Sequence, residues 1–273
     1  MNKELKKCIS QEEQKAILID LIVEFDSFCR KNDLKYYLIA GTLLGAVRHS
    51  GFIPWDDDVD VCMFRKDYDR LMEIYSGSSP KYKLLSLNKD RDYYYPFAKL
   101  VNDDTVLIES KNAPRNLGLY LDIFPFDNCP GRTLQEACRS IDKTKFLRDL
   151  RNLKMVDFSK DRRLYKNIIL LAGKIFSFPL SCRRISQLLS DKACKNKDTD
   201  CRYVGELVNT AYGHGEVFDK KYFGNGVKIK FEGHEFLAPE NYDAVLKSMY
   251  GNYMELPPIE KRKSHHGFVC WYK

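Results

Sequence analysis

The sequence predicts an α+β fold, in which helices flank a mixed β-sheet and a basic, mostly helical segment is inserted. Three observations support this prediction. An amphipathic helical pattern covers residues 11–31, short runs of strand-forming residues dominate residues 36–124, and a helical pattern returns from 133 to 193 before strand patterns reappear near 227–237. Strands that share a chain with packed helical stretches are typical of mixed α and β domains.

The first helix has both a start signal and an apolar stripe. Ser10 and Glu13 form a Ser-x-x-Glu capping box, and Asn32 with Asp33 marks the end. Apolar residues recur between them at helical spacing, at Leu18, Leu21, Ile22, Phe25 and Cys29. We therefore expect one helix over residues 11–31 with this stripe in the core.

The later elements are expected in a definite order. Strands are predicted at 36–40, 58–63, 83–87, 97–101, 105–109 and 119–124, with helices at 42–48 and 67–75 between the first three of them. After the helical segment, we expect strands at 227–231 and 235–237 and a helix at 240–250 that ends at Gly251. The tail after Pro258 is expected to be irregular.

Composition excludes several classes of protein. With 273 residues, of which 44% are apolar and 30% charged, the chain can build a full core, and it has no run of about 20 apolar residues that could span a membrane. Residues 1–15 lack the apolar centre of a signal peptide. Nine scattered cysteines without a Cys-x-x-Cys pair indicate free thiols. We expect a cytoplasmic protein.

Residues 37–61, YLIAGTLLGAVRHSGFIPWDDDVDV, carry the most informative pattern. An apolar run ends in a Gly-Thr step at Gly41 and Thr42, and a short helical pattern follows. The first backbone N–H groups of a helix can bind a phosphate, and the Thr42 hydroxyl can donate to a phosphoryl oxygen. We therefore expect phosphate contact at this step rather than a simple turn.

Four aspartates follow within five residues, at Asp56, Asp57, Asp58 and Asp60. Side chains two apart on a strand share a face, so Asp58 and Asp60 would point the same way, with Val59 and Val61 buried behind them. Two unpaired carboxylates on one face repel each other, and a divalent cation relieves the repulsion. The β-branched neighbours favour such a strand over a solvated acidic turn, and the pattern predicts a metal-dependent phosphate-transfer site.

Three motifs in order resemble the LicD/fukutin-related branch of the nucleotidyltransferase fold. They are Gly41-Thr42, IPWDDDVD at 53–60 and GLYLDIFPFD at 118–127, where Asp122 matches the third acid of the family. Further similar segments lie at 95–109, 239–258 and 260–267. The resemblance covers most of the chain except about residues 132–202.

The resemblance implies a nucleotidyltransferase-like catalytic core at 1–131 and a C-terminal part of the same domain, with a basic tail, at 203–273. Residues 132–202 would form a helical basic insertion or lobe. The implied activity is transfer of a phospho-alcohol, such as phosphocholine, from a CDP-alcohol donor to a hydroxyl of a cell-surface glycan or glycolipid, with CMP leaving. Nucleic acid is not an expected partner.

The resemblance also assigns roles to individual residues. Asp58, Asp60 and Asp122 would be the catalytic carboxylates and would hold one or two Mg²⁺ ions, with Mn²⁺ as an alternative. Asp122 would also take or orient the proton of the acceptor hydroxyl. Gly41 and Thr42 would fix the donor phosphate.

Several assignments stay open at this stage. Arg48, Lys99 and His265 are candidates for donor binding, and a solvated side chain is the alternative for each. One of Asp56 and Asp57 would orient the loop that carries the four aspartates. The alternative is that it is a plain capping acid. The aromatic residues Tyr93 to Tyr95, Trp55 and Trp271 fit a core better than a cage for a quaternary ammonium group.

Two other functions remain as alternatives. A nucleotidyltransferase proper would transfer the nucleotide and release pyrophosphate. A non-catalytic partner in polysaccharide assembly would use the same fold, although a scaffold has no need of three convergent carboxylates.

The basic segment adds a question of its own. Residues 132–202 hold 18 of the 45 Lys/Arg and 8 of the 38 Asp/Glu, a net +10, so that the rest of the chain carries −3. Within it, residues 162–184 have an apolar middle and basic ends. A buried helical hairpin is the favoured interpretation, and a segment lying at the inner face of an anionic membrane is the alternative.

Overall fold

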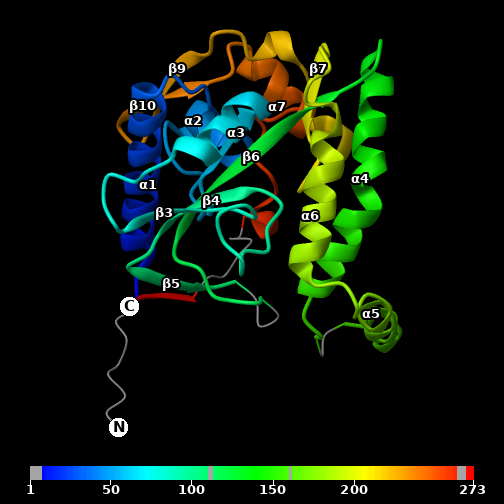
Figure 1. Cartoon of the computed structure of the whole chain (residues 1–273). Helices are drawn as coiled ribbons and strands as arrows, with labels where there is room; N and C mark the ends of the chain where they lie inside the picture. Colours follow the sequence, from blue (N-terminus) through cyan, green and yellow to red (C-terminus); the bar gives the residue numbers. More distant parts are fainter. Residues whose placement is uncertain (1–7, 110–112, 160–161, 263–268) are drawn as a thin grey trace.

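The computed structural model describes residues 8–109, 113–159, 162–262 and 269–273, and it confirms a mixed α+β fold (Figure 1). Within these residues the strands form one seven-stranded sheet and two two-stranded sheets. Helices pack on the large sheet, and three further helices stand beside it.

The large sheet is built around one long strand. Its main path runs β1 (Tyr37–Leu38), β2 (Asp60–Phe64), β6 (Tyr120–Cys129), β4 (Ala98–Asn102) and β3 (Tyr82–Leu85), and β6 also pairs with β7 (Tyr203–Glu206), which pairs with β8 (Val217–Asp219). The β2–β6 pairing is parallel, and the other pairings are antiparallel. Strand β6 therefore keeps β2 on one side, and on its other side it pairs first with β4 and then with β7.

Helix α1 (Gln11–Lys31) matches its prediction in bounds and in cap. The Ser10 hydroxyl accepts from the Glu13 amide, and the Glu13 carboxylate accepts from the Ser10 amide. All five predicted apolar residues of its stripe are buried in the main core. The other α-helices outside residues 132–202 are α2 (Ala40–His49), α3 (Arg65–Ile74) and α7 (Tyr242–Tyr250). Helix α7 ends at Gly251, which has a positive φ of 67°.

Two small sheets complete the core region. One pairs β9 (Val227–Phe231) with β10 (His234–Ala238), and the other pairs β5 (Thr105–Ile108) with β11 (Val269–Tyr272). Strand β11 contradicts the irregular tail expected there. It forms because β5, which lies far from it in the sequence, offers an edge with which it pairs. Short 3-10 helices lie at Cys194–Asn196, Gly213–Glu216, Lys220–Tyr222 and Ile259–Lys261.

Three helices lie between β6 and β7 in the sequence: α4 (Leu134–Met155), α5 (Leu164–Phe176) and α6 (Cys182–Ala193). Helices α4 and α6 run side by side along one flank of the sheet, and α5 projects from their lower end (Figure 1). The chain then returns to the large sheet through β7. No helix within the described ranges is both long enough and apolar enough to cross a bilayer.

Several predicted boundaries were wrong. Strand β2 begins at Asp60 rather than at residue 58, and α2 begins at Ala40 rather than at residue 42. Strand β6 continues past Pro125 to Cys129, because its neighbour changes there from β4 to β7 and the missing N–H of proline falls at the change. Strands β7 and β8 were missed because they are only four and three residues long.

A buried ion pair joins α3 to β6. Arg65, the first residue of α3, donates from Nε and Nη2 to the two carboxylate oxygens of Asp127, each at 2.8 Å. Both side chains are buried. The two parallel hydrogen bonds fix the start of α3 against the middle of the sheet.

We predict that Arg65→Leu lowers the free energy of unfolding by about 3–5 kcal/mol, because it leaves the Asp127 carboxylate buried without its partner. Urea denaturation followed by circular dichroism measures the loss. The matched control is Lys145→Leu, which breaks an exposed Lys145–Asp149 pair on α4 and should change stability by less than about 1 kcal/mol. Equal effects of the two substitutions would contradict this account.

Candidate active site

Three charged residues form a row across the middle of the large sheet. Asp60 on β2 pairs directly with Asp122 on β6, and Asp122 pairs directly with Lys99 on β4. Directly paired residues of neighbouring strands project to the same face, so the two carboxylates and the ammonium group are adjacent. The Lys99 Nζ lies 2.6 Å from Asp122 Oδ1.

Asp58 precedes β2 by two residues but keeps the alternation of the strand. Val59 and Val61 are fully buried, whereas Asp58 and Asp60 are only partly buried. The Val59 carbonyl accepts from the Asp122 amide at 3.0 Å, so the pairing with β6 already begins there. The valines therefore lie behind the acids, as the sequence pattern predicted.

The start of α2 holds the backbone of Asp60 from both sides. The Asp60 amide donates to Thr42 Oγ1 at 2.8 Å, and the Asp60 carbonyl accepts from the Ile39 amide at 3.2 Å. Ala40 between them has a φ of +50°, which is unfavourable for a residue with a Cβ. Thr42 is buried, and its hydroxyl positions Asp60 in this structure.

Gly41 lies against a further carboxylate. A Cβ at this position would come within 2.5 Å of Asp56 Oδ2. The absence of a side chain at residue 41 thus lets the loop with Asp56, Asp57 and Asp58, called the acidic loop below, pack against the start of α2. Asp57, next in the loop, is buried.

The carboxylates destabilise one another's charged forms. Burial raises the pKa of Asp60 well above its usual value, and repulsion from Asp58, Asp122 and Asp56 adds to the rise. Burial raises the pKa of Asp122 to about 6, although the nearby Lys99 opposes the rise. The site therefore favours the binding of positive charge.

Lys99 is enclosed by aromatic rings rather than by solvent. It is 1% exposed, and its Nζ lies 3.2 Å from the ring centre of Tyr120 and 4.4 Å from that of Tyr95. Glu109, directly after β5, approaches the same Nζ at 3.8 Å and accepts from the hydroxyls of both tyrosines. This burial excludes the solvated alternative for Lys99, and sequence reasoning had not singled out Glu109 or the two rings as its neighbours.

Two tyrosines from the C-terminal part complete the surroundings of the acids. The rings of Tyr212 and Tyr250 pack edge to face at 4.7 Å, and the charges of Asp60 and Asp56 help raise the pKa of both hydroxyls, although burial is the largest cause. Nothing in the sequence pattern distinguished them, because they come from a 3-10 turn region and the end of α7.

Arg48, another predicted binding residue, contacts the C-terminal part of the chain. Arg48, at the end of α2, donates from Nη1 to the Tyr253 carbonyl at 2.9 Å, and its Nε lies 3.2 Å from His49 Nε2. The guanidinium of Arg262 lies 5.7 Å from the ring centre of Trp55. His265 falls outside the described residues.

As they stand in the described part of the chain, no three His, Cys, Asp or Glu side chains are arranged to hold a metal ion. Asp58, Asp60 and Asp122 nevertheless supply oxygen ligands of the kind that Mg²⁺ binds.

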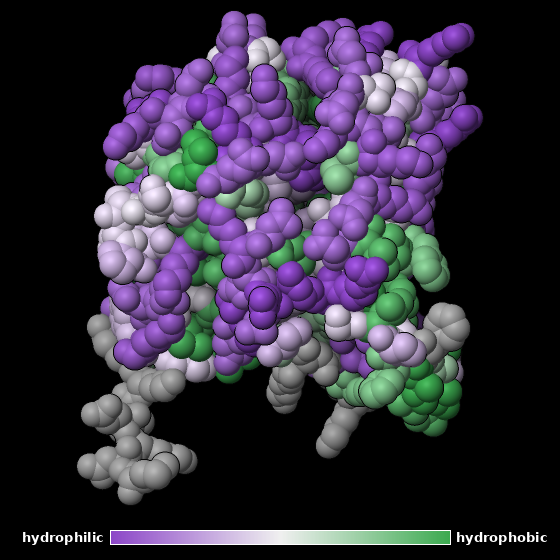
Figure 2. All heavy atoms as spheres, viewed as in Figure 1, coloured by the Kyte–Doolittle hydropathy of each residue, from purple (hydrophilic) through white to green (hydrophobic). Residues whose placement is uncertain are grey.

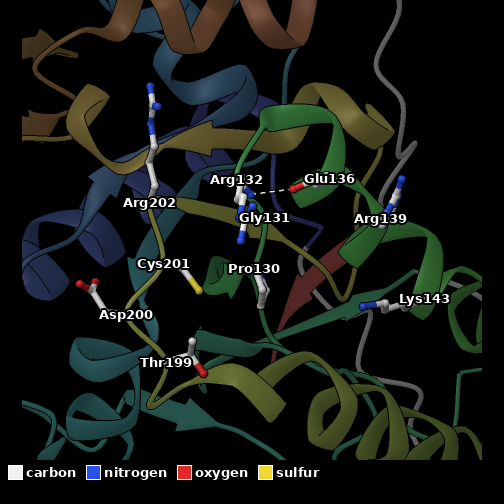
Figure 3. A pocket seen from close by; sticks show the side chains of 10 residues that line it. All are labelled: Pro130, Gly131, Arg132, Glu136, Arg139, Lys143, Thr199, Asp200, Cys201 and Arg202. Atoms are coloured by element: carbon white, nitrogen blue, oxygen red, sulfur yellow. Dashed lines mark hydrogen bonds between the residues drawn. The ribbon is translucent and has the colours of Figure 1, made fainter.

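A charged hollow of about 590 Å³ lies elsewhere, beside the start of α4 (Figure 3). Arg132, Arg139, Lys143 and Arg202 stand around it, and the Arg132 amide donates to Glu136. None of the predicted site residues that the structure describes lines this hollow, so it is separate from the row of Asp60, Asp122 and Lys99.

Comparison with known proteins adds independent information. The family model described as LicD/FKTN/FKRP, nucleotidyltransferase domain, matches residues 33–162. This range contains the Gly-Thr step, the acidic loop, Lys99, Glu109 and Asp122.

Individual relatives extend the match. The chain is 30% identical over 275 residues to the lipopolysaccharide cholinephosphotransferase LicD of Haemophilus influenzae, covering 95% of this chain and 97% of that protein. The match therefore extends across residues 132–202, which the motif resemblance had left out. It is 28% identical over 93 residues to the human ribitol 5-phosphate transferase FKRP, covering 34% of this chain and 17% of that protein. An uncharacterized protein of Rickettsia prowazekii is 29% identical over 129 residues, 47% of this chain and 46% of that protein.

We predict that Thr42→Val lowers the free energy of unfolding by about 1–3 kcal/mol, because it leaves the Asp60 amide without its acceptor. Thr42→Ser, which keeps the hydroxyl, is the matched control and should retain most of the stability. Thermal and urea unfolding of both variants measure the difference. If Thr42→Val unfolds like the wild type and only weakens donor binding, the hydroxyl acts on phosphate instead.

Proposed function

The chain belongs to the LicD/FKTN/FKRP family, and we propose that it transfers a phospho-alcohol, such as phosphocholine, from a CDP-alcohol donor to a hydroxyl of a cell-surface glycan or glycolipid. CMP would be the leaving product. The family and the full-length similarity to LicD make the protein a phospho-alcohol transferase. The observation that carries the proposal is the row of Asp60, Asp122 and Lys99, because it lies inside the matched domain and gathers charge suited to phosphoryl transfer.

We further propose a nucleotidyltransferase-like core at 1–131, completed by residues 203–273, with the helical lobe 132–202 on the acceptor side. The return of the chain to β6 through β7 supports joining the first and last parts. The net +10 charge of the lobe supports an anionic partner for it. We expect the protein to act at the cytoplasmic side.

Mg²⁺, with Mn²⁺ as an alternative, is the proposed cofactor. Asp58 and Asp60 would hold it, with Asp122 as the third carboxylate. Burial, and after it the crowding of these acids, raises the pKa of Asp60, and such a site fits a group that supplies positive charge. When bound, the ion would neutralise charge on the donor's diphosphate and stabilise the leaving CMP.

The chain's own residues would position the reactants. Asp122 would accept the proton of the acceptor hydroxyl while that oxygen forms a bond to the transferred phosphorus and the bond to the CMP oxygen breaks. Lys99 would hold Asp122 and lie near the transferred phosphoryl group. The N–H groups at the start of α2, around Gly41, would bind a donor phosphate, and Arg48 and His265 remain candidates for the diphosphate.

Product analysis tests the proposal against its alternatives. The protein is incubated with Mg²⁺, a panel of CDP-alcohols and a glycan panel. Release of CMP with a modified glycan supports the proposal, and release of pyrophosphate from a nucleoside triphosphate supports a nucleotidyltransferase. No turnover with any pair would favour a non-catalytic partner in polysaccharide assembly.

We predict that Asp58→Asn and Asp60→Asn each reduce turnover more than about 100-fold, because each removes a carboxylate that would neutralise or orient charge at the phosphoryl group. Excess chelator should do the same to the wild type. Asp33→Asn, an exposed position after α1, is the control and should keep the wild-type rate. Near-normal rates in either site variant, or in excess chelator, contradict the metal assignment.

We predict that Asp122→Asn lowers kcat far more than it raises the dissociation constant of the donor. The amide is nearly isosteric but cannot accept the acceptor's proton. Single-turnover kinetics and donor titration separate the two quantities. A collapse of donor affinity with an unchanged rate for the bound donor would make Asp122 a binding residue.

A further inference from the structure

Helix α5 presents an apolar surface to solvent instead of burying it. Leu164 is 76% exposed, Ile168 58%, Ile175 65% and Phe178, just beyond the helix, 83%. Ile169, Tyr165 and Leu171 are exposed as well. Figure 2 shows the hydrophobic side chains gathered at the lower right, where Figure 1 places α5. The sequence interpretation of a buried hairpin is therefore wrong for this helix.

The exposed apolar side chains share one face of the helix. At about 100° per residue, Leu164, Ile168, Ile169 and Ile175 fall with the other exposed apolar residues within an arc of about 160°. The opposite side contacts the lobe, where Leu170 is buried. There Lys174 Nζ also donates to the Lys154 carbonyl at 3.1 Å. The apolar face consequently points away from the body of the protein.

Basic residues lie before, within and after this helix in the sequence. Residues 162–184 contain six Lys/Arg and no Asp/Glu. Arg163, Lys166 and Arg184 are exposed. Arg183 is not available to a partner, because it donates to the carbonyls of Leu87, Asp90 and Tyr93 at 2.6–2.9 Å.

We propose that α5 and residue Phe178 dock onto an anionic lipid bilayer, with the apolar face in the headgroup–acyl boundary and the exposed cations on lipid phosphates. An amphipathic helix with a wide apolar face and basic flanks is the chemistry that such a surface binds. A second copy of the chain fits less well, because a symmetric contact would bring two acid-free basic segments together. The face defined by Leu164, Ile168, Ile169, Ile175 and Phe178 is called the α5 face below.

The lobe that carries the α5 face is connected to the acidic row. Besides Arg183, Ser186 on α6 donates to the Tyr94 carbonyl at 2.6 Å, and the Arg151 guanidinium on α4 lies 4.6 Å from the ring centre of Tyr95. Tyr95 in turn contacts Lys99. Docking would thus hold the site close to a membrane-anchored acceptor. Lipid binding itself requires neither donor nor acceptor, so the inference goes beyond the proposed function and is tested without it.

Vesicle sedimentation of the full chain is the test. Wild type is compared with Ile168→Asp, with Arg163→Gln/Lys166→Gln and with the control Leu134→Asp, an exposed apolar position at the far end of α4. The vesicles are phosphatidylcholine alone or mixed with phosphatidylglycerol, at low and high salt. Circular dichroism and gel filtration report the fold and the oligomeric state of each variant.

We expect wild type and Leu134→Asp to bind the anionic vesicles equally. Ile168→Asp should bind at least about tenfold more weakly, because an aspartate in the apolar boundary is strongly disfavoured. The double glutamine variant should lose binding mainly at low salt. Wild type that fails to bind, or Ile168→Asp that binds like wild type while folded, overturns the proposal. A dimer that Ile168→Asp splits, without vesicle binding, also overturns it and makes the α5 face a contact between copies.

Discussion

The imbalance of charge at the centre of the sheet is the constraint to which the rest of the site responds. Asp56, Asp58, Asp60 and Asp122 approach one another in a partly buried region, and the buried Lys99 lies beside Asp122. At an effective dielectric constant of about 20, two like charges 4 Å apart repel by about 4 kcal/mol. A fold that keeps this arrangement must hold the acids by their backbones, and the adjacent strands β2 and β6 do so for Asp60 and Asp122.

Residues outside the sheet give the acids further support. Thr42 and Ile39 fix the amide and the carbonyl of Asp60, at the expense of a positive φ at Ala40. Further along β6, the Arg65–Asp127 pair anchors the same strand that carries Asp122. Unfavourable backbone conformations cluster at functional sites, where the packing of the surrounding residues must maintain them. The positive φ of Ala40, beside the converging carboxylates, fits this pattern.

The sequence predicted what depends on local pattern and missed what depends on partners distant in the chain. The capping box and apolar stripe predicted α1, and the alternation at Val59 and Val61 predicted the face of the acids. No local pattern could reveal that Thr42 would bond to Asp60, or that Tyr212 and Tyr250 would approach the acids, since tertiary contacts decide these. The apolar run of α5 illustrates the same limit, because periodicity defines a face but not what covers it.

The hydrogen bonds from Arg183 and Ser186 to the loop that carries Tyr93 to Tyr95 have a thermodynamic consequence. They connect a helix of the lobe to the Tyr95 ring beside Lys99. A displacement at one end that broke these bonds would remove a constraint from the other end. Such coupling is reciprocal: whatever factor a ligand at the acids imposes on the lobe's affinity for its partner, that partner imposes on the ligand. Residence of the lobe at its partner and occupancy of the site would then change each other by the same factor.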